Sequence, residues 1–236
     1  MDKYIKEYRI SLRDMGTEFR TKDTMLFHNF EEAFAQLCLK HHITGYDLDK
    51  KGLMWVIGNI NLEISDKLPI WNENVRFELW FSEVKKLRAF LEFEAYWQDK
   101  SVAHGDSCWF VLNQQTRRPV GIDEIVKPCG TIDQTVFESH KKVNPNPDSM
   151  ELIRETDYTV LRQDLDYNGH VNNVSYIDWM ELPKTYEIKN YSVNFLQECF
   201  LNEHLTLKLY KKDKELYFEV IKKDDTKACT IFAKLK

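Results

Sequence analysis

Apolar residues recur at helical spacing in one early segment of the chain and at strand spacing on both sides of it. Between Phe27 and His42, apolar residues at i, i+3, i+4, i+7 and i+8 form the stripe typical of a buried helix: Phe30, Ala33, Phe34, Leu37 and Cys38. Apolar and polar residues alternate, as in half-buried strands, over 4–12, 54–64, 75–82, 87–97 and 102–112. The first half therefore predicts a strand, a long helix and about four antiparallel strands.

The second half repeats this order of elements. Residues 152–161 have an extended pattern, residues 172–182 a helical one that stops at Pro183, and strands are expected over 191–200, 205–210, 216–221 and 228–235. Between the halves, Pro128, Gly130, Pro145 and Pro147 interrupt the regularity. We therefore expect a first domain at 1–125, a linker at 126–149 and a second domain at 150–236, two copies of one helix-wrapped antiparallel sheet.

Composition excludes several classes of protein. The 236 residues carry 33 Lys and Arg against 38 Asp and Glu, a net charge of −5 that argues against nonspecific nucleic-acid binding. The five cysteines are odd in number and lack CxxC spacing, which excludes a fully paired disulfide framework and a cysteine-rich zinc site. The start of the chain has no apolar core of a secretory signal, and no apolar run is long enough to span a bilayer. A soluble protein of a reducing compartment is expected.

One loop departs from the pattern of core and surface residues. An acid, an amide and an imidazole, Asp166, Asn168 and His170, stand at i, i+2 and i+4 just before the second predicted helix. In an extended loop these side chains project to one side, which suits attack on a carbonyl with amide groups nearby. Asp and Asn before a helix are also ordinary capping and turn residues, so spacing alone leaves both interpretations open.

The motif Asp164-Leu165-Asp166-x-Asn168-x-His170-Val171-Asn172-Asn173-x-x-Tyr176-Ile177-x-Trp179 resembles the signature of the acyl-acyl carrier protein (ACP) thioesterases. Phe195-Leu196-Gln197-Glu198-Cys199 and Cys108-Trp109-Phe110-Val111-Leu112-Asn113 are also similar to that family. The resemblance covers nearly the whole chain. It implies an α+β fold of two tandem hotdog domains, each a long helix wrapped by a curved antiparallel sheet, with most of the acyl-chain pocket in the first.

The resemblance further implies that Asp166, Asn168, His170 and Glu198 form the catalytic set, and Cys199 matches a position once proposed as a nucleophile. Neighbouring residues of a strand face opposite sides, so only one of Glu198 and Cys199 can face His170. We favour Glu198 as the base for attack by water over an acyl-enzyme on Cys199. His28, placed before the first helix, is interpreted as a degenerate half-site.

The expected activity is hydrolysis of fatty acyl-ACP to free fatty acid and holo-ACP in fatty acid biosynthesis. An acyl-CoA thioesterase and a non-hydrolytic acyl-binding protein are the alternatives. No cofactor and no metal are expected, nor a nucleic-acid or membrane partner, and the protein is expected to be cytoplasmic and either a monomer or a homodimer. Basic residues that could meet the acidic carrier are Lys85, Lys86, Arg88, Arg117 and Arg118. Acyl-chain preference does not follow from the sequence.

Overall fold

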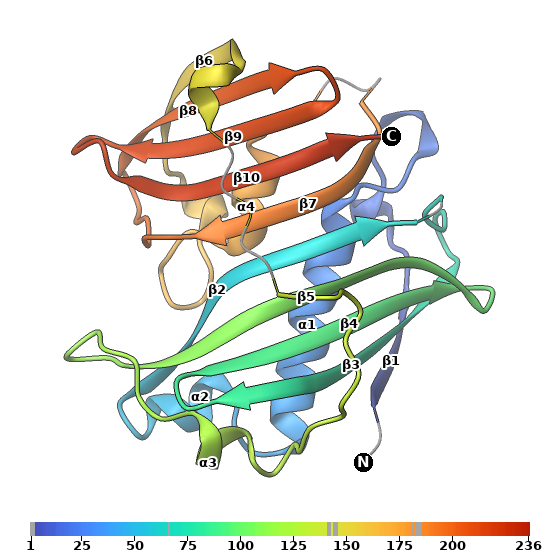
Figure 1. The fold of residues 1–236 in the computed structure, drawn as a ribbon, viewed down its shortest axis with the longest axis vertical. Helices are drawn as coiled ribbons and strands as arrows, with labels where there is room; N and C mark the ends of the chain where they lie inside the picture. The colour runs from blue at the N-terminus through green and yellow to red at the C-terminus, as the bar shows by residue number, and fades with distance from the viewer. Residues whose placement is uncertain (1–2, 66, 141–142, 144–145, 181, 183–185) are drawn as a thin grey trace. The chain divides into compact units, whose positions relative to one another are not determined.

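The computed structural model describes residues 3–65, 67–140, 143, 146–180, 182 and 186–236. The chain divides into two compact units, residues 1–140 and 141–236. The boundary between them lies within the range predicted as a linker. Figure 1 shows the elements of both units.

The first unit is an antiparallel sheet with a long helix against one face. Its strands lie in the order β1-β3-β4-β5-β2, with bounds Tyr4–Arg9 (β1), Leu53–Ile64 (β2), Asn74–Lys85 (β3), Arg88–Trp97 (β4) and Lys100–Asn113 (β5). The helix α1 is Thr24–Lys40, and two short helices, α2 and α3, are Gly45–Asp49 and Asp123–Val126. All the strands expected in this half are confirmed. Their apolar and polar residues alternate because one face of the sheet packs against the helix.

Aromatic side chains fill the space between α1 and the sheet. The ring of Phe34 stacks on Trp109 with centroids 3.9 Å apart, and Phe30 lies 4.6 Å from Phe93 of β4. The predicted helical stripe is buried throughout. The helix begins at Thr24, however, so the interpretation of His28 as a residue ahead of the helix is wrong: the segment from Thr24 to Phe27 contains no helix breaker, and His28 lies in the second turn.

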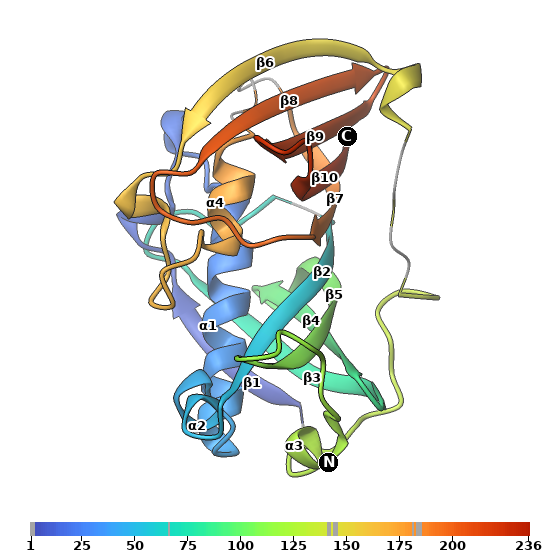
Figure 2. The same ribbon diagram turned by 90° about the vertical axis from the view of Figure 1, so that its left-hand side faces the viewer.

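The second unit is also an antiparallel sheet. Its strands lie in the order β7-β10-β9-β8-β6, with bounds Glu151–Thr159 (β6), Ile188–Phe195 (β7), His204–Lys212 (β8), Glu215–Lys222 (β9) and Lys227–Leu235 (β10). Figure 2 shows β6 beside β8. Asp213 and Asp225 have positive φ in the two hairpin turns that join β8 to β9 and β9 to β10. Antiparallel strands with few helices fit the hotdog fold.

The helix of the second unit, α4, is much shorter than predicted, spanning only Asn173–Asp178. Arg154 of β6 donates to the carbonyl oxygens of Trp179 (3.3 Å) and Met180 (2.5 Å), which satisfies acceptors that a longer helix would use internally. Pro183 also lacks the amide that would bond to the Trp179 carbonyl in a continued helix. The predicted helix to residue 182 is therefore wrong at Trp179 and Met180, which lie beyond the last residue of α4. Glu181 lies outside the described residues.

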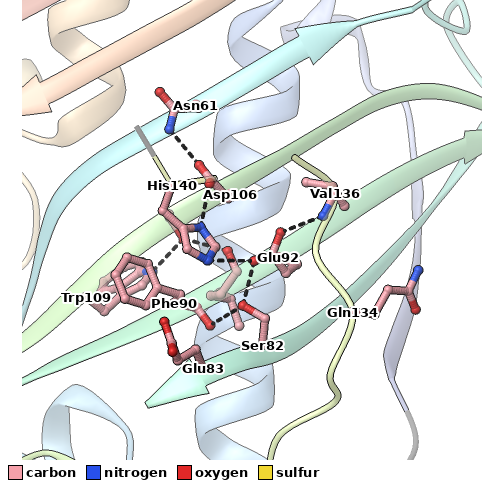
Figure 3. A network of polar contacts seen from close by, with 12 residues as sticks. Asn61, Ser82, Glu83, Phe90, Glu92, Asp106, Trp109, Gln134, Val136 and His140 are labelled. Atoms are coloured by element: carbon pink, nitrogen blue, oxygen red, sulfur yellow. Dashed lines mark hydrogen bonds and ion pairs between the residues drawn. The ribbon is translucent and has the colours of Figure 1, made fainter. Parts of the chain in front are cut away.

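The segment after α3 packs on the face of the first sheet opposite α1. The Ile132 amide donates to the Phe81 carbonyl (2.9 Å), and the Trp80 indole donates to the Gln134 carbonyl (2.8 Å). His140 ends this segment between two buried carboxylates: its Nδ1 lies 2.7 Å from Asp106 Oδ2, and its Nε2 3.6 Å from Glu92 Oε1 (Figure 3). Residues 129–140 of the predicted linker thus belong structurally to the first unit.

Glu92 and Asp106 face each other on β4 and β5, so the pair would place two carboxylates side by side in the interior. Like charges at low dielectric are costly unless partnered. Ser82 and the Val136 amide donate to Glu92, and Asn61 donates to Asp106. The hydrogen bond to Asp106 raises the pKa of His140, and burial raises the pKa of Glu92.

Within the described residues, no helix has both the length and the apolar character required to cross a membrane.

Candidate active site

The loop carrying Asp166, Asn168 and His170 folds around the Asp166 carboxylate. Asp166 Oδ1 accepts from the backbone amides of Asn168 (2.8 Å) and His170 (3.1 Å), and Oδ2 accepts from the Asn168 side-chain amide (3.1 Å). Gly169 has φ +78°, a conformation that favours glycine. The loop is therefore a tight turn and not the extended segment that was expected, and the carboxylate organises the backbone instead of contacting the imidazole.

The imidazole of His170 contacts Glu198. Its Nδ1 lies 3.3 Å from Glu198 Oε1, and both side chains are partly exposed, at 21 % and 28 %. Bridge pairing of His170 with Phe200, together with a hydrogen bond from the Val171 amide to the Cys199 carbonyl (2.9 Å), brings the two segments together. The Phe200 ring meets the imidazole edge to face at 5.2 Å. An acid and an imidazole thus lie together at a site that solvent reaches.

Glu198 and Cys199 lie beyond the strand to which they were assigned. The strand β7 ends at Phe195, where pairing with Cys229 of β10 stops. The amides of Leu196 and Gln197 then both donate to the Ala228 carbonyl, at 2.9 and 3.1 Å, which breaks the regular ladder. The prediction of a strand to Phe200 is therefore wrong, and strand alternation does not decide which residue faces His170.

Cys199 is fully buried. Burial raises the pKa of its thiol, an effect that a hydrogen bond with Tyr176 of α4 partly offsets. A thiol with a raised pKa carries little of the thiolate that is needed for nucleophilic attack. Of the two adjacent residues, only Glu198 has a contact with His170 in the described structure.

Asp164 and Asn172 of the motif have structural roles. The carboxylate of buried Asp164 accepts from the Tyr158 hydroxyl (2.8 Å) and the Leu161 amide (2.7 Å). Asn172 caps α4, its side chain accepting from the Val174 amide at 2.8 Å. These two residues therefore have the turn and capping roles that spacing left open.

Two residues of this region were missed by sequence reasoning. Lys222, at the end of β9, donates to the Glu198 carbonyl at 2.7 Å, and pairs with Glu203 at 2.9 Å. Lys222 is 24 residues from Glu198 and belongs to an unremarkable alternating strand, so the sequence contains no signal for this contact. Glu203 is closer, but it resembles any surface acid in a turn.

The arrangement provides a carboxylate able to accept a proton, an imidazole beside it and a side-chain amide held by Asp166. These are the groups that general-base attack of water on an activated carbonyl uses. The bonds of Asp166 fix the Asn168 side-chain amide and the backbone that carries His170, which limits the reorganisation needed in a reaction.

Comparison with known proteins identifies the family. A model of the acyl-ACP thioesterase N-terminal domain matches residues 1–129, and a model of the C-terminal domain matches residues 148–233. The chain is 28 % identical over 168 residues to the chloroplastic oleoyl-acyl carrier protein thioesterase of Coriandrum sativum, covering 64 % of this chain and 45 % of that protein. It thus spans about half the length of the curated relatives it matches.

Solved structures agree in fold. An acyl-ACP thioesterase from Bacteroides thetaiotaomicron superposes with a TM-score of 0.85 at 18 % identity, over 98 % of this chain and 97 % of that chain. The 12:0-ACP thioesterase from Umbellularia californica gives 0.84 at 18 % identity, over 99 % and 97 %. At such identities the likeness establishes the fold alone. Because the family models together match most of the sequence, this chain belongs to the acyl-ACP thioesterase family.

Proposed function

We propose that this protein hydrolyses the thioester of a fatty acyl chain carried on the phosphopantetheine arm of ACP, releasing free fatty acid and holo-ACP for fatty acid biosynthesis. The observation that carries the proposal is the contact between His170 and Glu198, 3.3 Å apart, at the family's motif. Relatives named as thioesterases of oleoyl-ACP and palmitoyl-ACP support the substrate class. No cofactor or metal is needed in this proposal, because a thioester carbonyl is already activated.

In the proposed reaction Glu198 removes a proton from water while the water oxygen bonds to the carbonyl carbon. His170 orients the water, and Asn168, held by Asp166, orients the thioester. The carbon–sulfur bond then breaks, the phosphopantetheine leaves as a thiolate, and the proton taken by Glu198 is available to neutralise it. Electrons and protons balance without any further reactant.

The alternative chemistry, an acyl-enzyme on Cys199, is less well supported. Its sulfur is buried with a raised pKa and lies against Tyr176, whereas a nucleophilic cysteine needs thiolate character and access. Glu198 is partly exposed and beside the imidazole. We therefore retain Glu198 as the base, with Cys199 as the less favoured nucleophile.

We also propose that the two units are tandem hotdog domains, at 1–125 and 150–236, as a monomer or homodimer. Residues 126–149 connect them, and the part of this connection up to His140 packs on the first sheet. The repeated order of strand, helix and antiparallel strands supports this division. The family resemblance implies that most of the acyl-chain pocket lies in the first domain, while the second carries the proposed catalytic groups.

The test is incubation of the purified protein with a panel of acyl-ACPs and the matching acyl-CoAs, measuring released thiol and identifying the released acids. The proposal expects multiple turnovers and a higher kcat/KM for acyl-ACP than for acyl-CoA. Preference for acyl-CoA would indicate the alternative thioesterase. A stable acyl-ACP complex without release of acid would indicate a non-hydrolytic binding protein.

A further inference from the structure

The backbone around Glu198 is held by a partly buried ion pair, of which Lys222 comes from a distant strand and Glu203 from the same segment as Glu198. Lys222 donates from Nζ to the Glu198 carbonyl at 2.7 Å, and the same Nζ lies 2.9 Å from Glu203 Oε1. The two side chains are only 15 % and 24 % exposed. Lys222 comes from the end of β9, a regular element whose position the sheet determines.

Glu203 holds the segment around Glu198 at a second point. Its Oε2 accepts from the Phe200 amide at 2.9 Å, so the pair binds the segment at the Glu198 carbonyl and again two residues later. Between these points the Cys199 carbonyl accepts from Val171, the residue after His170. Three consecutive residues are thus fixed, the middle one by a bridge hydrogen bond and the outer two by side-chain contacts that a regular strand would not provide.

A surface ion pair stabilises a protein by only about 0–1 kcal/mol, so charge pairing alone would not explain this arrangement. Here the lysine bonds to a backbone carbonyl that lies outside the strand ladder, at the residue whose side chain meets the imidazole. Without the lysine, that carbonyl would lose its charged donor and the turn would be free to adopt other conformations. The contact therefore couples the β9 terminus to the position of the Glu198 carboxylate.

We propose that Lys222, with Glu203, is a positioning residue that holds Glu198 against His170. For its kinetic consequence, this inference rests on the proposed thioesterase function. A displacement of about 1 Å in a reacting group can cost about 100-fold in rate. Losing the lysine is accordingly expected to lower kcat while leaving substrate binding nearly unchanged.

The kinetic test compares Lys222→Met with Lys222→Arg and with Lys223→Met, which removes the same charge from the exposed neighbouring residue. Lys222→Met is expected to lower kcat for acyl-ACP at least tenfold with KM within about twofold, since catalysis depends on geometry at the reacting atoms. Lys222→Arg, which keeps the charge and donors, should recover much of the loss, and Lys223→Met should be unaffected. Unchanged kcat in Lys222→Met, or an equal loss in Lys223→Met, would overturn the inference.

A second measurement tests the geometry independently of turnover. The ¹⁵N signals of the His170 imidazole report its contact with Glu198, and Glu198→Ala provides the reference for losing that contact. Lys222→Met, or Glu203→Gln if the first variant fails to fold, should shift these signals toward the Glu198→Ala values. Wild-type signals in both variants would refute positioning even in an active enzyme. Absence of turnover in the wild type would instead contradict the proposed function, leaving the spectra to decide the inference.

Discussion

Asp166 acts on the backbone of the motif loop rather than on the imidazole. Its two oxygens accept from both amides of Asn168, backbone and side chain, and from the backbone amide of His170, within a turn that needs the positive φ of Gly169. This arrangement uses the partly buried carboxylate as a local template. In the proposed reaction Asp166 would therefore act indirectly, by fixing the Asn168 side chain and the backbone of His170.

Replacing Asp166 with Ala should therefore affect stability and rate together. Three hydrogen bonds lose their acceptor, which predicts a loss of about 1–3 kcal/mol in the free energy of unfolding. The rate should fall because Asn168 and His170 lose their fixed positions. Urea denaturation and kcat with acyl-ACP measure the two effects. Asp166→Asn, which keeps one acceptor oxygen, should be intermediate, and a wild-type rate in Asp166→Ala would contradict the template role.

At this scale the sequence offered candidate residues but not their contacts. Residue types and spacing drew attention to Asp166, Asn168 and His170, and the family resemblance added Glu198. Spacing within the motif could not show a contact between His170 and Glu198, because it depends on pairing of two segments some 30 residues apart. The contact of Lys222 with the Glu198 carbonyl could not be predicted for the same reason.

Among the elements, strands were predictable wherever one face is buried against a helix and the other is polar. Prediction failed where tertiary contacts override the local pattern. Arg154 donates to the carbonyls at the end of α4, which would be used inside a longer helix. The Ala228 carbonyl accepts from two successive amides, which ends the regular pairing of β7. Residues 129–140, polar and interrupted by Gly130, looked like a linker, but they are bound to the first sheet by contacts with distant strands.

His140 holds residues 129–140 on the first sheet by contacting carboxylates from two strands. Asp106 of β5 and Glu92 of β4 contact it, and Glu83 of β3 adds a more distant negative charge. Phe90 stacks on its ring at 4.1 Å. The pKa of His140 is raised, chiefly by its hydrogen bond to Asp106, above the ordinary value of 6.5. A protonated imidazole therefore compensates the buried acids.

This predicts a pH-dependent stability with a definite sign. Since the folded state holds the His140 proton more tightly than the unfolded state, the stabilisation is fully present below pH 6.5 and is lost as pH rises through the folded pKa. The raised pKa of Glu92 has the same sign, in a range that begins near 4.5.

The measurement is urea denaturation of wild type and His140→Gln between pH 6 and 9. The variant should be less stable at pH 6 by about 1–3 kcal/mol, with the difference shrinking as pH rises. If the difference in free energy of unfolding between wild type and His140→Gln stayed constant or grew with pH, the stabilising charge assigned to His140 would be contradicted.

The whole molecule has a net charge of −5, so attraction of an acidic carrier protein would require a locally basic surface. The Ile122 amide donates to the Lys86 carbonyl at 2.8 Å, which brings the β3–β4 turn beside the segment that follows Arg118. Lys86, Arg88, Arg117 and Arg118 are all exposed. The basic residues singled out from the sequence thus lie on neighbouring parts of one unit.

If this surface receives the carrier, Lys86→Glu/Arg88→Glu should lower kcat/KM for acyl-ACP about tenfold at low salt, because association is steered by charge. Activity on acyl-CoA should change little, and the defect should diminish as salt is raised. The control is Lys6→Glu/Arg9→Glu on the edge strand β1, which pairs with β3 toward its Asn74 end, away from the β3–β4 turn. Equal losses in both variants, or for both substrates, would exclude a specific docking surface.

The central claim is that Glu198, beside His170, activates water for thioester hydrolysis. The most direct test is the single-turnover rate of acyl-ACP cleavage by Glu198→Gln, which keeps size and hydrogen bonding but removes the base. The account predicts a fall of about 10²- to 10⁴-fold, with no acyl adduct on Cys199 by mass spectrometry at any time. A Glu198→Gln rate near that of the wild type, or an acyl group found on Cys199, would contradict it.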